Sequence, residues 1–376
     1  MRIPFRIAAG TALLATTAAQ TWSKCNPLQQ TSCPPNTALG MTIDVDFTKG
    51  SVNSFEAQGV PSYSSTDGAT FTVAASGDAP QLNSLFYIMF GRVEITMRAA
   101  PGAGIVSSLV LESDDLDEID VEWLGSNPNE LQSNYFGKGR TTDYNRGRFH
   151  AVPAGTQNRW VTYAIDWTQD RIQWIVDGAA VRELRRQDAD QDQYPQTPMQ
   201  VKFGTWAGGD PSRNPPGTVE WARGPTDFSK GPFSMTVRSL RVTDYSTGKQ
   251  YRYKDTSGSW QSIEAVGGQV NGNAGASKNA PTVTATGVAP PTTSGPGVPV
   301  GGMVKDGSPA TKTQTGWPWV GTNPPTGGSI PSGWYMTSSG KIMRSAAAAL
   351  ATPSLLLSAV SASVAVGVAI FMGRTP

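Results

Sequence analysis

The stretch FYIMFGRVEITMRA, residues 86–99, shows the pattern on which the predicted fold rests. Its second half alternates apolar and polar side chains, as a strand with one buried face does. Short segments of this kind recur along the chain between turn residues: IVSSLVLES, DEIDVEWLG, LQSNYFG, RWVTYAIDWT, RIQWIVDG, MQVKFGTWAGG, TVEWA and FSMTVRSLRVTDY. No long segment of the sequence has helical periodicity. The sequence therefore predicts an all-β protein, an antiparallel β-sandwich of the jelly-roll type.

The composition supports this fold class and limits the partners. The chain has 376 residues, of which 38% are hydrophobic and 16% charged, so it can bury one sizeable core. Its 41 glycines and 28 prolines argue against a helical protein. The formal net charge of +1 gives no electrostatic reason to expect nucleic acid or an anionic membrane surface as a partner.

The N-terminal segment has the features of a secretory signal. Residues 1–19 combine Arg2 and Arg6 with a short apolar stretch and small residues at its end, so we expect cleavage after this segment. A buried core helix fits less well, because polar residues follow at once without helical periodicity. In the oxidising compartment that such a signal implies, Cys25 and Cys33 are expected to form a disulfide that pins the N-terminus.

The C-terminal part predicts a stalk and an anchor. Residues 266–340 are rich in Gly, Pro, Ser and Thr and would bury too little apolar surface to fold, so we expect a disordered stalk. Residues 341–376 carry a short polar stretch and a terminal apolar run, the pattern of a GPI-anchor signal. A transmembrane helix is the alternative, since the run could span a bilayer and Arg374 follows it. One folded domain, residues 20–265, lies between, and we expect a secreted protein held at the cell surface by the GPI anchor alone.

Four carboxylates crowd into DEIDVE, residues 117–122. On a strand, Glu118, Asp120 and Glu122 share one face and the apolar residues between them share the other. A solvated outer face is the simplest explanation. However, acids two residues apart lie about 7 Å from each other, and each charged pair costs about 2 kcal/mol at an effective dielectric constant of about 20. With no Lys or Arg interleaved, the row should raise at least one pKa, as a general acid near neutral pH requires.

Two carboxyl groups of this kind are what retaining glycoside hydrolysis needs. One acts as nucleophile and the other as acid and then base, about 5–5.5 Å apart. Ideal strand geometry separates the Cα atoms of Glu118 and Glu122 by about 13 Å. We therefore expect a concave sheet that carries the acids in a substrate groove on its hollow side, with Asp120 between them affecting both.

Other acid-rich or nucleophilic sites fit less well. The stretch SDDLDEIDVE, residues 113–122, has acids at alternating positions but lacks the glycine that an EF-hand calcium loop needs at its sixth position. Two cysteines and one histidine, His150, are too few for a Cys/His zinc site and leave little room for Ser-His-Asp or Cys-His mechanisms. We therefore expect no metal and no cofactor, and assign His150 no role.

These motifs together resemble a known family. DEIDVEWLG matches the E-x-D-x-E signature of glycoside hydrolase family 16, and its surroundings resemble the fungal Crh branch of cell-wall transglycosylases: FGRVEITMRAAPGAGIVSSLVLESDDLDEIDVEWLG, NYFGKG, PQTPMQVKFGTWAGGDP and GTVEWARG. The resemblance covers most of residues 22–245. It implies a β-jelly-roll fold, with Glu118 as nucleophile, Asp120 as assisting acid and Glu122 as acid/base. It also implies cleavage of chitin and transfer of the released chain to β-glucan or chitin, which cross-links the wall.

Candidate sugar-binding residues lie outside the acidic strand: Asn134, Tyr135, Lys202, Trp206, Thr218 and Trp221. Polysaccharide sites place aromatic rings and hydrogen-bonding side chains in one groove. Lys202, Gly204 and Trp206 should share a strand face, with the glycine allowing a sugar to approach the backbone. Thr218 and Glu220 in TVEWA should likewise share one face, with Trp221 at its end. Core packing is the alternative for each aromatic residue. The family resemblance favours Lys202, Trp206 and Thr218 as donor-subsite residues.

Three other functions are alternatives to transfer. A wall-bound carbohydrate-binding protein would be expected to lack one of the three acids, and none is missing. A simple chitin or β-glucan hydrolase would share every catalytic residue with a transglycosylase, so the family resemblance favours transfer. A stalked adhesin would account for the C-terminal half but not for DEIDVE. We expect a monomer whose partners are chitin and β-glucan.

Overall fold

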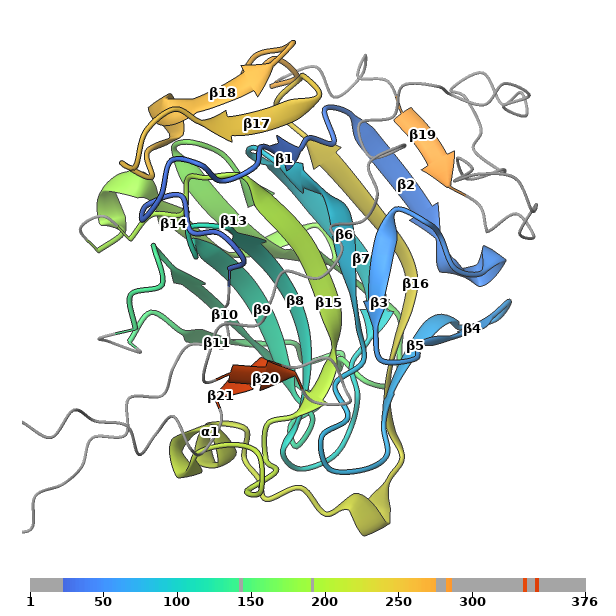
Figure 1. Ribbon diagram of the computed structural model, residues 1–376. Helices are drawn as coiled ribbons and strands as arrows, with labels where there is room; N and C mark the ends of the chain where they lie inside the picture. The colour runs from blue at the N-terminus through green and yellow to red at the C-terminus, as the bar shows by residue number, and fades with distance from the viewer. Residues whose placement is uncertain are drawn as a thin grey trace, which may run out of the picture.

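A computed structural model describes residues 23–141, 145–190 and 193–274, with the backbones of short strands at 282–285, 334–336 and 342–344. The predicted signal and most of the predicted stalk and anchor signal lie outside the described residues. Two large antiparallel sheets dominate the chain, and Figure 1 shows them layered against each other. The predicted antiparallel β-sandwich is confirmed.

The first large sheet has seven strands and carries the acidic stretch. Figure 1 shows its central strands long and bowed. In spatial order the strands are β11 (Arg148–Ala151), β10 (Glu130–Phe136), β9 (Glu118–Leu124), β8 (Ile105–Ser113), β15 (Met199–Ala207), β6 (Gln81–Ile88) and β3 (Phe55–Gln58).

The second large sheet has nine strands and covers the first. Its main path is β14 (Ala179–Arg185), β13 (Arg171–Val176), β12 (Val161–Trp167), β7 (Gly91–Arg98), β16 (Phe233–Asp244), β2 (Thr42–Asp46) and β19 (Thr282–Ala285). Two further strands, β5 (Gly68–Val73) and β4 (Ser62–Ser64), extend it from β16. β19 pairs with β2 in parallel, whereas the other strands pair antiparallel.

The remaining elements are short. A three-stranded sheet contains β1 (Asn36–Thr37), β17 (Gln250–Tyr253) and β18 (Ile263–Val266), and a two-stranded one contains β20 (Trp334–Met336) and β21 (Ile342–Arg344). Single 3₁₀ turns are η1 (Phe47–Lys49), η2 (Arg186–Asp188), η3 (Phe228–Lys230) and η4 (Trp260–Ser262). The one α-helix among the described residues is α1 (Pro216–Trp221).

The core lies between the two large sheets, where strand alternation directs the apolar side chains. On β9 the inward residues Ile119, Val121 and Trp123 are at most 2% exposed. The Trp123 ring meets Tyr163 of the opposite sheet edge-to-face, with centroids 4.6 Å apart. Packing of the inward side of β9 fixes which residues its other side presents.

The segment TVEWA is a helix, so the predicted strand there is wrong. Pro216 begins α1 at the first helical position, where its fixed φ suits a helix and no amide hydrogen is needed. The backbone amide of Ala222 then donates to the carbonyls of Thr218 and Glu220, which closes the helix. Six residues, fewer than two helical turns, are too few to display helical periodicity, so the alternation of apolar and polar letters was misleading.

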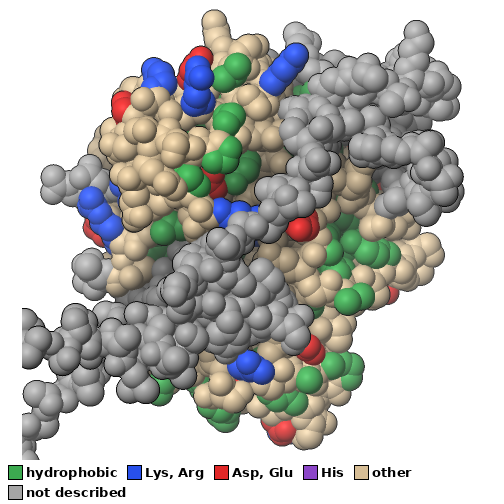
Figure 2. Space-filling model, in the orientation of Figure 1, with side chains coloured by type: hydrophobic (Ala, Val, Ile, Leu, Met, Phe, Trp, Pro, Cys, Tyr) green, Lys and Arg blue, Asp and Glu red, His purple; other side chains and the backbone are tan. Residues whose placement is uncertain are grey.

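Covalent and hydrogen bonds stabilise the structure at both ends of the folded domain. The predicted Cys25–Cys33 disulfide is confirmed, with Cα atoms 5.6 Å apart. At the other end, the Asn273 amide donates to the carbonyls of Asp244 and Ser246, so packed structure continues beyond residue 265, where we expected the domain to end. No helix in the described part of the chain is both long and apolar enough to cross a bilayer. Figure 2 shows charged side chains of both signs interspersed on the visible face.

Candidate active site

The outward face of β9 carries a row of three carboxyls, those of Glu118, Asp120 and Glu122. We call this side of the sheet the acidic face. Directly paired residues of antiparallel strands point to the same side of a sheet, so the register extends this face onto β8, β10 and β15. Glu118 is opposite Glu112, Asp120 is opposite Asn134, and Glu122 is opposite Gln132 and Ser108. Lys202 is opposite Val110, the neighbour of Asp120, and Trp206 is opposite Val106. The predicted acids, Asn134, Lys202 and Trp206 therefore lie on one face.

The electrostatics of the row differ from one acid to the next. Burial, then repulsion from Asp120 and Glu112, raises the pKa of Glu118 well above its usual value, and Lys202 opposes the shift. Burial and Glu122 raise the pKa of Asp120, whereas a hydrogen bond with Glu118 lowers it. Burial, then Glu118, raises the pKa of Glu122 to about 8. Glu122 therefore keeps its proton at neutral pH, and Glu118 and Asp120 are both harder to ionise than isolated carboxyls.

The acidic face also holds acceptors that lack donors. Among the described residues, no hydrogen bond reaches four buried oxygens on this face: Asn83 Oδ1, Glu112 Oε1, Asp120 Oδ1 and Asn134 Oδ1. A buried acceptor without a partner costs about 1–3 kcal/mol. A ligand rich in hydroxyl groups would supply the missing donors.

Lys202 pairs with Glu112, a residue that the sequence analysis did not predict to be in the site. Its ammonium forms an ion pair with Glu112 on the neighbouring strand. Glu112 is 7% exposed and faces Glu118 across the β8–β9 pairing. The segment IVSSLVLES shows a lone acid at its end, but only the strand register reveals that this acid joins the row.

Two tryptophans close one end of the acidic face. The rings of Trp206 and Trp221 stack with centroids 6.2 Å apart and planes 23° apart. The Trp221 indole donates to Gln132 Oε1 at 3.0 Å, which joins α1 to β10. Thr218 is three residues from Trp221, so both lie on the same side of the helix. Trp206 is only 9% exposed, so much of its surface packs within the protein.

Three finer expectations are wrong. Tyr135 is opposite Ile119 and 3% exposed in the core, so it points away from the acidic face. Thr218 and Glu220 do not share a face, because residues two apart on a helix point in different directions. A Cβ at Gly204 would lie 2.3 Å from the Pro80 carbonyl oxygen, so a close backbone approach within the protein, rather than room for a sugar, accounts for this glycine.

An exposed aromatic ring on the edge strand was not predicted. Phe149 on β11 is 46% exposed and opposite Gln132, which places it on the acidic face in the row of Glu122. The Arg223 guanidinium lies 5.1 Å from its ring centroid and pairs with Glu130. The surrounding RGRFHAV has no recognisable motif, so only the register identifies Phe149.

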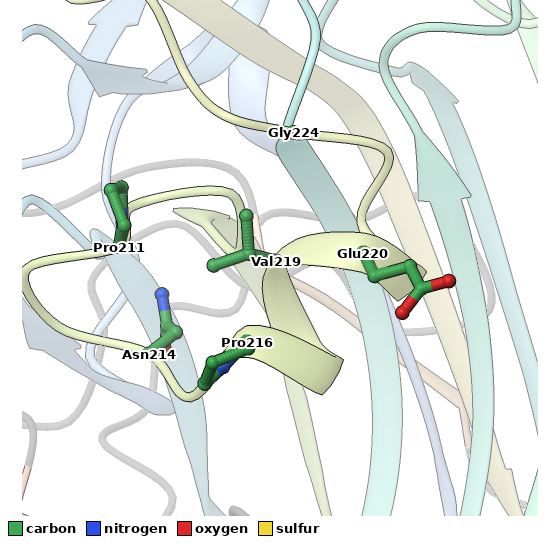
Figure 3. Close-up of a pocket in the computed structure, with 6 residues that line it drawn as sticks. All are labelled: Pro211, Asn214, Pro216, Val219, Glu220 and Gly224. Atoms are coloured by element: carbon green, nitrogen blue, oxygen red, sulfur yellow. The ribbon is translucent and has the colours of Figure 1, made fainter.

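A separate pocket lies beside α1. It has a volume of about 420 Å³ and is lined by Pro211, Asn214, Pro216, Val219, Glu220 and Gly224. Figure 3 shows the Glu220 carboxylate pointing away from the other labelled side chains. None of the three acids lines this pocket, so the catalytic candidate remains the acidic face.

A β-sandwich that aligns three carboxyls on one strand, one of them protonated at neutral pH, has the arrangement of a glycoside-cleaving enzyme. Residues 48–223 match the model of the family "Glycosyl hydrolases family 16". Crh-like protein 4 of Botryotinia fuckeliana is 58% identical over 346 residues, which cover 90% of each chain. Crh-like protein 4 of Aspergillus fumigatus is 50% identical over 91% of this chain and 76% of that protein.

A solved structure agrees with the sequence relatives. The Crh5 transglycosylase in complex with NAG is 51% identical, with a TM-score of 0.62, and the match covers 64% of this chain and 99% of that one. The chain therefore belongs to glycosyl hydrolase family 16, in its Crh-like group. The family resemblance stated from the sequence is confirmed, and the protein is an enzyme that acts on polysaccharides.

Proposed function

We propose that this enzyme is a retaining transglycosylase of the fungal cell wall. It cleaves chitin and transfers the released chain to β-glucan or chitin, which cross-links the wall. The observation that carries the proposal is the alignment of Glu118, Asp120 and Glu122 on the acidic face of one strand. The likeness to a solved transglycosylase in complex with NAG supports both the reaction class and the donor sugar.

The roles follow from the protonation pattern. The Glu118 carboxylate attacks the anomeric carbon and forms a glycosyl ester, while Glu122 gives its proton to the departing sugar oxygen. Glu122, now ionised, takes a proton from the hydroxyl of the acceptor, which attacks the same carbon and releases Glu118. Asp120, which is hydrogen-bonded to Glu118, takes the proton of Glu118 when substrate binds and so frees the nucleophile.

Sugar contacts are proposed on both sides of the row. The four unpartnered acceptors suit sugar hydroxyls and amides. Lys202, Trp206 and Thr218 remain proposed donor contacts, with Trp221 behind Trp206. We add Phe149 as an acceptor contact, because its exposed ring lies two strands, about 10 Å, from Glu122, the residue that activates the acceptor.

The ends of the chain complete the proposal. Residues 1–19 act as a cleaved secretory signal, and residues 341–376 direct GPI attachment at the outer face of the plasma membrane. The enzyme works there as a monomer on wall polysaccharides. The Cys25–Cys33 disulfide suits a secreted protein.

A transfer assay tests this function. The purified protein is incubated with a chitin oligosaccharide and a fluorescent laminarin-type acceptor, and products are followed by mass spectrometry. The proposal predicts label in hybrid chains and none with Glu118→Gln. Shortened donor alone would indicate a hydrolase, and unchanged sugars would favour a carbohydrate-binding protein.

A further inference from the structure

A tryptophan and an arginine of the nine-stranded sheet reach the core side of the acidic strand. Trp174 on β13 and Arg182 on β14 face each other in register. The Trp174 indole donates a hydrogen bond to the backbone carbonyl of Asp120 at 2.9 Å. The Arg182 guanidinium lies 4.6 Å from the Trp174 ring centroid. Trp174 therefore contacts the central acid of the row through its backbone, and Arg182 packs against the Trp174 ring.

Arg182 also forms hydrogen bonds with β10, the strand next to β9. It donates to the carbonyl of Ser133 at 2.9 Å and to Ser133 Oγ at 3.0 Å. Its second terminal nitrogen donates to the carbonyl of Arg146 at 2.9 Å. Ser133 is opposite Val121, the neighbour of Asp120 in sequence. These bonds hold the guanidinium beneath β10 and β9.

No carboxylate within the described ranges forms an ion pair with Arg182, because all its hydrogen bonds go to neutral oxygens. Burial lowers the pKa of Arg182 to about 10, because the charged guanidinium loses part of its hydration at this position. Arg182 is partly buried, and a cation withdrawn from water without a local anion is unfavourable unless its charge is used elsewhere. Asp120, whose pKa Arg182 lowers against burial and Glu122, is the acid that benefits.

The row of acids on β9 contains more carboxyl groups than nearby cations, so each cation affects how readily these acids ionise. Charged and titratable groups on six strands act on Glu118, Asp120, Arg182 or His150: Glu118 and Glu122 (β9), Glu112 (β8), Lys202 (β15), Tyr135 (β10), Arg148 and His150 (β11), and Arg182 (β14). Lys202 is already paired with Glu112. Burial, Arg182 and Arg148 lower the pKa of His150, which keeps its ring neutral. Among the described residues, Arg182 is therefore the cation that lowers the pKa of the central acid of β9.

We propose that Trp174 and Arg182 are positioning residues for glycosyl transfer. The indole fixes the backbone of Asp120, and the guanidinium offsets the negative charge of the row from behind the sheet. This inference rests on the proposed function for its catalytic meaning, but the electrostatic part can be measured without turnover.

The test compares charge removal with a matched control. Arg182→Met removes the charge, Arg182→Lys restores part of it, and Arg185→Met removes an exposed arginine of the same strand that pairs with Glu183. The full protein, ¹³C-labelled at Asp and Glu carboxyls, is titrated by NMR. In Arg182→Met the midpoint of the coupled Glu118–Asp120 titration should rise by about one pH unit, with a smaller rise in Arg182→Lys and none in Arg185→Met.

Activity gives the second readout. In Arg182→Met the acidic limb of the pH–rate profile for transfer should shift to higher pH, by the same amount as the NMR midpoint. Trp174→Phe keeps the ring but loses the donor, and should lower kcat by about tenfold or more with little change in KM for the donor sugar.

An unchanged carboxyl titration in folded Arg182→Met would overturn the electrostatic part, and a wild-type kcat in Trp174→Phe would overturn the positioning part. If Arg182→Met does not fold, a titration in Arg182→Lys identical to that of wild type would overturn the first part instead. Absence of hybrid products with the wild-type protein would overturn the proposed function, and the NMR midpoint would still decide the electrostatic inference.

Discussion

Glu112 on β8 and Glu118 on β9 lie directly opposite each other on the acidic face. Like charges in such positions destabilise a sheet, and Lys202 relieves the contact by pairing with Glu112. The same ammonium lowers the pKa of Glu118, which burial and Asp120 raise. Lys202 therefore helps to ionise the proposed nucleophile besides its proposed contact with the donor.

Lys202→Met should move the acidic limb of the pH–rate profile to higher pH by about one unit. The substitution removes the cation that favours ionised Glu118 and frees the Glu112 charge beside it, and both changes raise the pKa of Glu118. The transfer rate between pH 4 and 8 provides the measurement. Lys249→Met, at an exposed lysine, serves as the control. Coincident profiles for the two variants would remove Lys202 from this role.

Glu118→Gln should reduce transfer by about a thousandfold or more while the fold remains intact. Glutamine cannot form the glycosyl ester, but it fits the same space and carries no buried charge. Circular dichroism and a thermal melt check the fold, and product analysis checks the rate. A lost melting transition would show that Glu118 supports the structure instead.

Glu122→Gln should lose activity on unactivated donors and recover much of the first step with an aryl glycoside whose leaving group needs no proton. In the wild-type enzyme the rate on natural donors should fall above about pH 8, where Glu122 loses its proton. Equal losses with both donor types would contradict its role as the acid.

Stability should decline from acidic to mildly alkaline pH. The folded pKa of Glu122, about 8, lies above its ordinary value of 4.5, so the folded state binds the proton more tightly. The resulting stability is complete below the ordinary value and is lost as pH rises through about 8. Glu122→Gln cannot ionise, so its melting temperature should exceed that of wild type at pH 9 and match it more closely at pH 5. If the melting temperatures of Glu122→Gln and wild type differed by the same amount at pH 5 and pH 9, the raised pKa of Glu122 would be contradicted.

Phe149→Ala should raise KM for the acceptor severalfold and leave donor cleavage almost unchanged. Loss of stacking against one sugar ring costs about 1 kcal/mol, close to a fivefold change. The comparison is Val60→Ala, at an apolar residue that is 91% exposed. An unaltered acceptor dependence would exclude Phe149 from the acceptor site.

Strand patterns predicted much of this architecture, because alternation on β9 decides both the core side and the acidic face. The row of acids followed from the same alternation, and the disulfide from two cysteines in a secreted chain. The short helix α1 escaped prediction because six residues cannot display a period. Glu112 and Phe149 could not be found because they join the site through pairing across strands, and sequence patterns do not specify register between distant segments. Tyr135 was misassigned because adjacent residues of a strand face opposite sides.

Trapping the glycosyl–enzyme tests the central claim most directly. Glu122→Gln is incubated with an activated aryl glycoside of a chitin oligosaccharide, since the intermediate should form and then persist without its base. Peptide mass spectrometry then locates the added sugar within residues 113–125. The account predicts the sugar mass on Glu118. A sugar on Asp120, or an unmodified strand after release of the aryl group, would contradict it.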